Sequence, residues 1–261
     1  MIKTLLLFFA IVALTNGFEF AQRLDATQFS ISSQIVEAIN DAKLQMPCGF
    51  PGMGIPPLAP LRIQHKDVKL NGENFLLSGD VNNVRFDGLD DFDVAEFKMS
   101  PIFSRVNFKF IWNHVHLNTL YDIVFKKGQR DMKRSGIANI DLKGLQVWGQ
   151  IKYKPGIRGN AEVKEFKMYF SLAEVHSEIE GLMKNKYLNR LANQMIEEWI
   201  MLAANDNTDD FAEMFNEFMV PMCNNMIGDK SLKDIIGIVG GGSGNGEKPE
   251  KQKCNPTPED F

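Results

Sequence analysis

Residues 106–125, VNFKFIWNHVHLNTLYDIVF, decide the fold, because their alternation of apolar and polar side chains is interrupted once. Before the interruption the alternating apolar residues are Val106, Phe108, Phe110 and Trp112. After Asn113 and His114 the alternation resumes one residue out of phase, with Val115, Leu117, Tyr121, Ile123 and Phe125. A period of two predicts a strand with one buried face, and a slip of one residue turns that face outward unless the strand bends. The stretch therefore predicts one long strand with a sharp bend.

The same slip recurs in residues 137–153, IANIDLKGLQVWGQIKY, at Gly144. The apolar positions before and after it are Ile140 and Leu142, then Leu145, Val147, Ile151 and Tyr153. The period of two extends from Val68 to about Leu172, and its last regular segment alternates Phe166, Met168, Phe170 and Leu172. Two slips in long strands predict a strongly curved antiparallel sheet in which one apolar face keeps turning inward.

Helical periodicity precedes the sheet. In residues 30–46, SISSQIVEAINDAKLQM, the apolar positions recur at steps of four and three: Ile31, Ile35, Ile39, Ala42 and Met46. Pro47 ends this helix, and a joint rich in proline and glycine follows at residues 46–61, MPCGFPGMGIPPLAPL. Proline fixes φ and lacks a backbone donor, so residues 54–61 are predicted to run extended.

Two apolar helices are predicted after the sheet. Residues 187–203, YLNRLANQMIEEWIMLA, carry a stripe of Leu188, Leu191, Ala192, Met195, Trp199 and Leu202, widened by Ile196, Ile200 and Ala203. Thr208 is expected to cap the second helix, whose stripe is Phe211, Met214, Phe215, Phe218, Met219 and Met222. A helix that is apolar over so much of its circumference is expected to be covered on several sides. The prediction is an α+β fold, a strongly curved antiparallel sheet wrapped around a long apolar C-terminal helix, with a long core or cavity inside.

The N-terminus has the pattern of a secretory signal. Residues 1–17, MIKTLLLFFAIVALTNG, contain Lys3, an apolar run of ten residues from Leu5 to Leu14, and a small residue at Gly17. Such a run is too short to span a bilayer, and no later segment is apolar enough to do so. We therefore predict a secreted chain with a signal peptide at 1–17, one domain at 18–228 and a flexible tail at 229–261.

The overall charge excludes some partners. The formal net charge is −4, from 29 lysines and arginines against 33 aspartates and glutamates. A mildly acidic chain without a basic block is not expected to bind nucleic acid or anionic membranes as its main partner.

Three cysteines permit one intramolecular disulfide bond in a secreted protein. Cys254 lies in the tail, which is rich in glycine, proline and lysine and is expected to be mobile. Cys48 and Cys223 lie beside apolar segments that are expected to be ordered. The prediction is a Cys48–Cys223 bond, with Cys254 left over.

No complete catalytic or metal-binding pattern occurs. His114 and His116 are two residues apart, so one strand would place both on the same side as half of a zinc site. No third ligand lies nearby in the sequence, and His65 and His176 are remote. The acidic run lacks the spacing of a calcium loop: Asp87, Asp90, Asp91 and Asp93. We predict no metal, no cofactor and no catalysis, and a structural role for Cys48 in place of a nucleophilic one.

Two segments of the chain resemble a known family. Residues 48–61, CGFPGMGIPPLAPL, and residues 108–123, FKFIWNHVHLNTLYDI, are similar to arthropod proteins related to the group 7 mite allergens, which are kin of the takeout and juvenile-hormone-binding family. The resemblance covers Phe29 to Met226. It implies half of a tubular lipid-binding fold, with a bent sheet around a long helix, an apolar tunnel, small lipid ligands and no catalysis. Takeout-type proteins carry two cysteines near the N-terminus, whereas this chain has only Cys48 there, which favours the group 7-like branch.

The combined prediction is a secreted carrier that holds a small lipid, such as a fatty acid or terpenoid, in an internal tunnel. Flexible thioethers and aromatic rings suit apolar ligands of irregular shape. The predicted lining is Phe108, Phe110, Trp112, Phe166, Met168, Phe170, Leu191, Met195 and Trp199. The main alternative is an interaction module with a dry core, whose C-terminal phenylalanine and methionine stripe docks on a receptor or a microbial lipid surface. A third hypothesis, a hydrolase of lipid esters, lacks a nucleophile–base pair.

Overall fold

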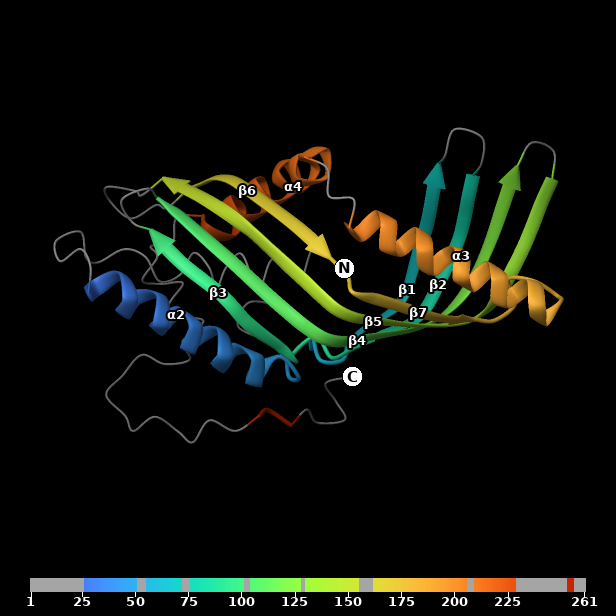
Figure 1. Cartoon of the computed structure of the whole chain (residues 1–261), viewed down its shortest axis with the longest axis horizontal. Helices are drawn as coiled ribbons and strands as arrows, with labels where there is room; N and C mark the ends of the chain where they lie inside the picture. The colour runs from blue at the N-terminus through green and yellow to red at the C-terminus, as the bar shows by residue number, and fades with distance from the viewer. Residues whose placement is uncertain are drawn as a thin grey trace.

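One antiparallel sheet of seven strands, flanked by three helices, forms the described part of the chain (Figure 1). This computed structural model describes residues 26–50, 55–71, 76–100, 104–127, 130–154, 162–205, 209–228 and 253–255. The strands are β1 Leu61–Asn71, β2 Leu76–Asp87, β3 Phe92–Ser100, β4 Arg105–Lys127, β5 Arg130–Lys154, β6 Glu162–Ser171 and β7 Glu174–Ile179. The helices are α2 Ala26–Gln45, α3 Lys186–Asn205 and α4 Asp209–Ile227. The predicted signal and most of the predicted tail lie outside the described residues.

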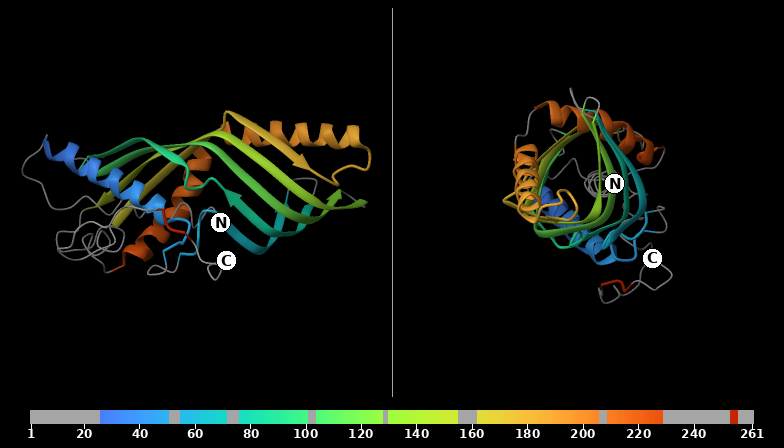
Figure 2. Two further views of the ribbon diagram at one scale, coloured as in Figure 1. Left: turned by 90° about the horizontal axis from the view of Figure 1, so that it is seen from below. Right: turned by 90° about the vertical axis from the view of Figure 1, so that its right-hand side faces the viewer.

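The sheet has two halves, which share the long strands β4 and β5. The packed half consists of β3, β6, residues 105–112 of β4 and residues 145–154 of β5. The open half consists of β1, β2, β7, residues 114–127 of β4 and residues 130–143 of β5. Seen along the long axis, the sheet is strongly curled and unclosed (Figure 2). The curved antiparallel sheet predicted from the period of two is confirmed.

The two halves meet at a bend at Asn113 of β4 and Gly144 of β5. The Cα register of the two strands is the same on both sides, so neither strand gains a residue over the other. Gly144 has a φ of +61°, and a Cβ on it would lie 2.7 Å from the Cβ of Ala173. Trp112 and Val115 are both buried, although regular alternation would put residues three apart on opposite faces. Both strands change phase together, so one apolar face continues through the bend, as the two slips predict.

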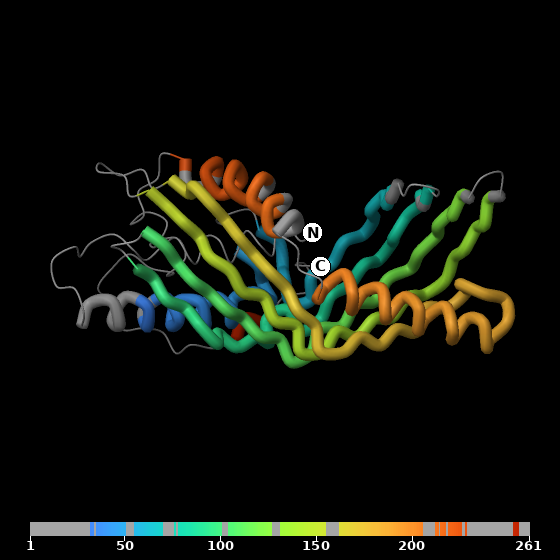
Figure 3. Tube along the Cα trace, turned by 45° about the horizontal axis from the view of Figure 1, so that its top comes forward, coloured from blue at the N-terminus to red at the C-terminus, as the bar shows by residue number. Residues whose placement is uncertain are grey.

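The main core lies on this face of the packed half. Figure 3 shows α2 and α4 flanking the sheet there, and their strand neighbours are β3 and β6 respectively. The strands contribute Phe92, Phe97, Met99, Val106, Phe108, Phe110, Trp112, Ile151, Val163, Phe166 and Met168. The helices contribute Ile35, Ile39 and Ala42 from α2, with Met46 directly after it, and Phe215, Met219 and Cys223 from α4. The predicted helical stripe at residues 31–46 is confirmed at the described positions, because its side chains face this core.

Helix α4 also satisfies the backbone of the edge strand β6. The Asn224 side chain accepts a hydrogen bond from the Val163 amide at 2.8 Å and donates one to the Val163 carbonyl at 2.9 Å. Asn216 accepts a third from the Phe166 amide at 2.8 Å. An edge strand otherwise presents unpaired donors and acceptors. The helix therefore replaces a neighbouring strand and also covers the core.

Helix α3 uses the same device on β7, at the edge of the open half. Asn193 accepts a hydrogen bond from the Ile179 amide at 2.8 Å and donates one to the Ile179 carbonyl at 3.1 Å. One turn further, Glu197 accepts from the Ser177 amide at 2.6 Å. Because residues four apart share one face of a helix, the side of α3 that caps β7 is polar. The predicted apolar stripe of α3 lies on the opposite side and is exposed, so the expectation that it is covered on several sides is wrong.

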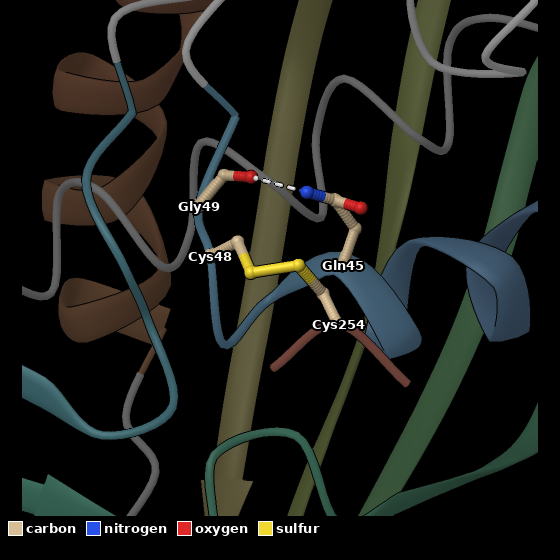
Figure 4. The surroundings of a disulfide bond; sticks show 4 residues. All are labelled: Gln45, Cys48, Gly49 and Cys254. Carbon is tan, nitrogen blue, oxygen red and sulfur yellow. Dashed lines mark hydrogen bonds between the residues drawn. A yellow bond between two sulfur atoms is a disulfide. The ribbon is translucent and has the colours of Figure 1, made fainter. Parts of the chain in front are cut away.

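The disulfide bond joins Cys48 to Cys254, with a Cα–Cα distance of 6.0 Å (Figure 4). The predicted Cys48–Cys223 bond is therefore wrong. Cys223 is a free thiol buried on the core side of α4, whereas Cys48 follows α2 in the proline-rich joint. Residues 253–255 return to the end of α2, where the Cys254 amide donates to the Leu44 carbonyl at 2.8 Å. A contact made by three residues within the glycine, proline and lysine-rich end of the chain leaves no periodic signal in the sequence.

Candidate functional site

The apolar face of the open half is the candidate site. Directly opposite residues on neighbouring antiparallel strands point to the same side. The register places on one face Val81 of β2, Leu117, Tyr121, Ile123 and Phe125 of β4, Met132, Ala138 and Ile140 of β5, and Ile179 of β7. The other face carries His65, Asp67, Asp80, Asp122, Lys133 and Glu178. The apolar face continues the face that forms the core of the packed half, and we call it the inner face.

Helix α3 covers a small part of this inner face. Tyr121, Ala138 and Ile179 are buried there, and Leu182 and Ile196 pack against them. The Tyr121 hydroxyl donates to the Glu180 carbonyl, and burial raises the pKa of this phenol. These contacts fasten the loop before α3 to the centre of the open half.

The rest of the inner face is less covered than a protein core. Ile123, Phe125 and Ile140 are half-buried, and Met132 near the tip of β5 is 41% exposed. Partly exposed apolar side chains on one side of a curled sheet form a surface on which an apolar molecule can lie without losing hydrogen bonds to water.

The stripe of α3 is a second apolar surface. Tyr187 is 75% exposed, Leu202 68%, Met195 63% and Trp199 62%. Leu188 and Leu191 extend the stripe along the helix. Apolar patches of this kind on a protein surface mark interaction sites more often than isolated apolar residues do.

The predicted lining residues fall into two groups. Six of them lie together in the packed half: Phe108, Phe110, Trp112, Phe166, Met168 and Phe170. The rings of Phe108 and Phe110 have centroids 5.5 Å apart, and that of Phe170 lies 5.4 Å from the ring of Phe215 of α4. The Trp112 indole donates to the Leu89 carbonyl at 3.1 Å. The other three, Leu191, Met195 and Trp199, belong to the exposed stripe of α3, so the structure does not bring the two groups together.

The inner face of the open half is the part that the predicted lining omits. The sequence does indicate this face, because the alternation after Asn113 puts Leu117, Tyr121, Ile123 and Phe125 on one side of the strand. The predicted lining took its strand residues from β4 before the bend and from β6 instead. Bulky aromatic side chains are also the residues that fill a dry core, so bulk does not separate a core from a pocket.

The two histidines of the bend lie on the outer face and share one carboxylate. His114 Nε2 lies 2.7 Å and His116 Nδ1 2.9 Å from the same oxygen of Asp141, so the prediction that both point to one side is confirmed. Burial alone would raise the pKa of Asp141, but the hydrogen bonds from His116 and His114 outweigh it and hold the pKa below its usual value. Of the predicted acidic run, Asp87 binds Arg85 through two oxygens and Asp90 pairs with Lys253.

The described helices include none that is long and apolar enough to cross a membrane. No curated protein sequence matches the chain.

Solved structures match the described part of the chain to different extents. The crystal structure of Takeout 1 from Epiphyas postvittana superposes with a TM-score of 0.53 at 13% identity, covering 75% of this chain and 90% of that one. At this identity the likeness shows a shared fold. Lipopolysaccharide binding protein matches with a TM-score of 0.35 at 8% identity, over 78% of this chain and 40% of that one.

The family model of the haemolymph juvenile hormone binding proteins matches residues 4–237, which is most of the chain. The bent antiparallel sheet and the Takeout-like fold agree with that match, and so does the family resemblance noted for residues 48–61 and 108–123. This chain belongs to the haemolymph juvenile hormone binding protein family.

Proposed function

We propose that the protein is a secreted carrier that binds a small hydrophobic ligand, such as a fatty acid or terpenoid, along the inner face of the open half. The observation that carries the proposal is the half-buried state of Ile123, Phe125 and Ile140 on a curled sheet. Membership of a family named for binding juvenile hormone in haemolymph supports an apolar ligand. The ligand would lie in a tunnel along the inner face of the open half. The core of the packed half would close one end of this tunnel.

The energetics of such binding need no specific polar group. Burying an alkyl chain stabilises the complex by roughly 0.8 kcal/mol for each CH₂. About ten methylenes therefore supply on the order of 8 kcal/mol, which corresponds to micromolar affinity before the cost of association is subtracted. The proposal includes no chemical turnover, because a carrier needs the ligand returned unchanged.

The first test is to ask whether the protein carries lipid. Protein purified without detergent from its secreting cells would be extracted and the extract measured by lipid mass spectrometry, and displacement of a fluorescent fatty acid would give the affinity. We expect a bound lipid and saturable probe binding. Protein that neither retains lipid nor binds the probe would reject the carrier function.

A matched pair of variants locates the site. Met132 and Ile137 both lie on β5 and are 41% and 39% exposed, but the register puts Met132 on the inner face and Ile137 on the outer face. Met132→Asp should weaken probe binding by about tenfold or more, because a carboxylate is costly beside an alkyl chain. Ile137→Asp should leave the affinity unchanged. Equal losses in both variants would place the ligand elsewhere.

A second candidate function is recognition of a lipid surface, and the exposed stripe of α3 favours it. Lys184, Lys186 and Arg190 are exposed at the N-terminal end of the stripe, where they would meet anionic headgroups. Vesicles of phosphatidylcholine with phosphatidylglycerol would be compared with phosphatidylcholine alone in a flotation assay. Flotation that is lost in Trp199→Glu, with the fluorescent fatty acid still bound, would assign the stripe to surfaces and the inner face to the small ligand.

A further inference from the structure

We propose that His65, Asp67 and Asp80 form a binding site for a divalent transition metal of the zinc class on the outer face of the open half. His65 and Asp67 are two residues apart on β1, so both side chains point to one side of the strand. Asp80 is the direct cross-strand partner of Asp67 on β2. The three residues offer one imidazole nitrogen and two carboxylate oxygens that lie within 4.8 Å of one another.

The imidazole of His65 is already oriented for such a ligand. Its Nδ1 lies 2.8 Å from the side-chain oxygen of Asn82, the cross-strand partner of His65. An amide oxygen only accepts hydrogen bonds, so Nδ1 carries the hydrogen. The lone pair of Nε2 is then free to bind a metal on the side of the two carboxylates. Metal-binding histidines are commonly held in this way, with the second ring nitrogen donating to an oxygen that fixes the tautomer and the ring.

The distances fit a metal centre. Nε2 lies 3.5 Å from Oδ1 of Asp67 and 3.7 Å from Oδ1 of Asp80. These separations are longer than a hydrogen bond, but ligands about 2.0–2.2 Å from a tetrahedral zinc ion lie roughly 3.3–3.6 Å from one another, so the Asp67 oxygen is within this range and the Asp80 oxygen is just beyond it. Imidazole nitrogen favours zinc, copper and nickel over calcium and magnesium, which take oxygen ligands. With three protein ligands, a tetrahedral metal ion at this exposed place would have one coordination position left for water.

The sheet register supplies an independent reason for a cation. Asp67 pairs with Asp80, and Asp80 pairs with Asp122 of β4, so three carboxylates stand side by side on one face across three strands. Like charges directly opposite one another destabilise a sheet. A divalent ion between the first two carboxylates and His65 would offset this repulsion. Protonation of Nε2 would also supply positive charge, and a metal titration distinguishes a bound metal ion from a protonated His65.

The test titrates zinc chloride into the oxidised, folded protein by isothermal calorimetry, with cobalt(II) visible absorption as a report on the coordination. We expect one saturable zinc site, an affinity at least about tenfold weaker in His65→Ala, and a loss of about tenfold in Asn82→Ala from the released ring. His176→Ala is the control, because this exposed histidine lies on the outer face away from the cluster.

Three results would overturn the proposal: no saturable zinc binding, the same affinity in His65→Ala as in the parent, or an equal loss in the His176→Ala control. Asp141→Asn is a second control, since it disables the His114 and His116 cluster, and it should leave the zinc affinity unchanged. Circular dichroism of each variant would verify that the sheet is intact. Binding of the fluorescent fatty acid, measured in parallel, keeps this site separate from the carrier function.

Discussion

The packed and open halves of the sheet share β4 and β5 but use one continuous apolar face in different ways. In the packed half α2 and α4 lie over the face, and Phe110, Trp112 and Phe166 are almost fully buried. In the open half the face meets α3 at its β7 edge, and Ile123 and Phe125 remain half-buried. The inner face is largely apolar in both halves, although Thr119 and Arg134 also lie on it in the open half. The two halves differ in how much of the apolar face the helices cover. The alternation of a strand therefore predicts which face is apolar, but not whether other side chains pack on that face.

The helices explain the difference in cover. Both α3 and α4 cap an edge strand with asparagine side chains. In α4 the capping residues Asn216 and Asn224 flank a face that also places Phe215 and Met219 in the core. In α3 the polar residues occupy the centre of the sheet-facing side, which turns the apolar stripe away from the sheet. Helix α4 therefore both caps β6 and packs on the core, whereas α3 caps β7 and leaves most of its apolar side chains exposed.

The largest expected effect separates two tryptophans. Trp112 of the packed half is 1% exposed, and Trp112→Ala should destabilise the protein by about 3–5 kcal/mol through lost burial and a cavity. Trp199 of α3, beside the open half, is 62% exposed, and Trp199→Ala should change stability by about 0.5 kcal/mol or less. Urea unfolding followed by circular dichroism measures both. Similar losses would contradict the difference in cover.

The disulfide bond gives the next effect. Cys254→Ser should destabilise the protein by about 2–4 kcal/mol, because the bond closes a loop with a sequence separation of 206. Cys48→Ser should cost the same, since either change removes the same bond, and thermal unfolding measures it.

Cys223 is the contrast to those two cysteines. Burial raises the pKa of its thiol to about 12, so the native protein should react with a maleimide far more slowly than the unfolded protein. Rapid labelling of Cys223 in the folded protein, or peptide mapping that finds it bonded to Cys48, would contradict the assignment.

The edge cap of the open half is expected to have a smaller effect. Asn193→Ala removes two hydrogen bonds to Ile179 and should cost about 1–3 kcal/mol, because the Ile179 amide loses its partner, whereas the Ile179 carbonyl keeps the bond from Asn189. Gln194→Ala changes the neighbouring exposed residue and serves as the control. Hydrogen exchange should quicken at Ile179 and Ser177 in Asn193→Ala and remain slow at Val163, which α4 caps in the packed half. Faster exchange at both edges would mean that the halves unfold as one unit.

The smallest effect concerns acid stability at the bend. Hydrogen bonds from His116 and His114 lower the pKa of Asp141 despite its partial burial. A carboxyl with a lowered folded-state pKa stabilises the fold above its unfolded-state pKa, about 3.9, and this stability is lost as the pH falls through the folded-state value. Asp141→Asn should therefore lower the melting temperature at neutral pH and make no difference at about pH 2. A constant difference at every pH would show that the carboxyl contributes no ionic stability.

Much of the fold was predictable because it depends on local periodicity. The strands around the bend, the phase change at Asn113 and Gly144, and the stripe at residues 31–46 all follow from the spacing of apolar residues. The candidate site was less predictable. The alternation named Leu117, Ile123 and Phe125 as one face, but the same pattern serves a filled core and an unfilled surface.

The sequence by itself determined which side chains share a face, where the sheet bends and that the bend is sharp, because the alternation of side chains is a property of a few neighbouring residues. Only the tertiary structure decided that α3 turns its polar side to β7, that Cys48 meets Cys254, and that His65, Asp67 and Asp80 converge. Those three outcomes depend on which distant segment arrives at an edge or a face. That choice is set by backbone hydrogen bonds and strand register, which the composition of a single segment does not encode.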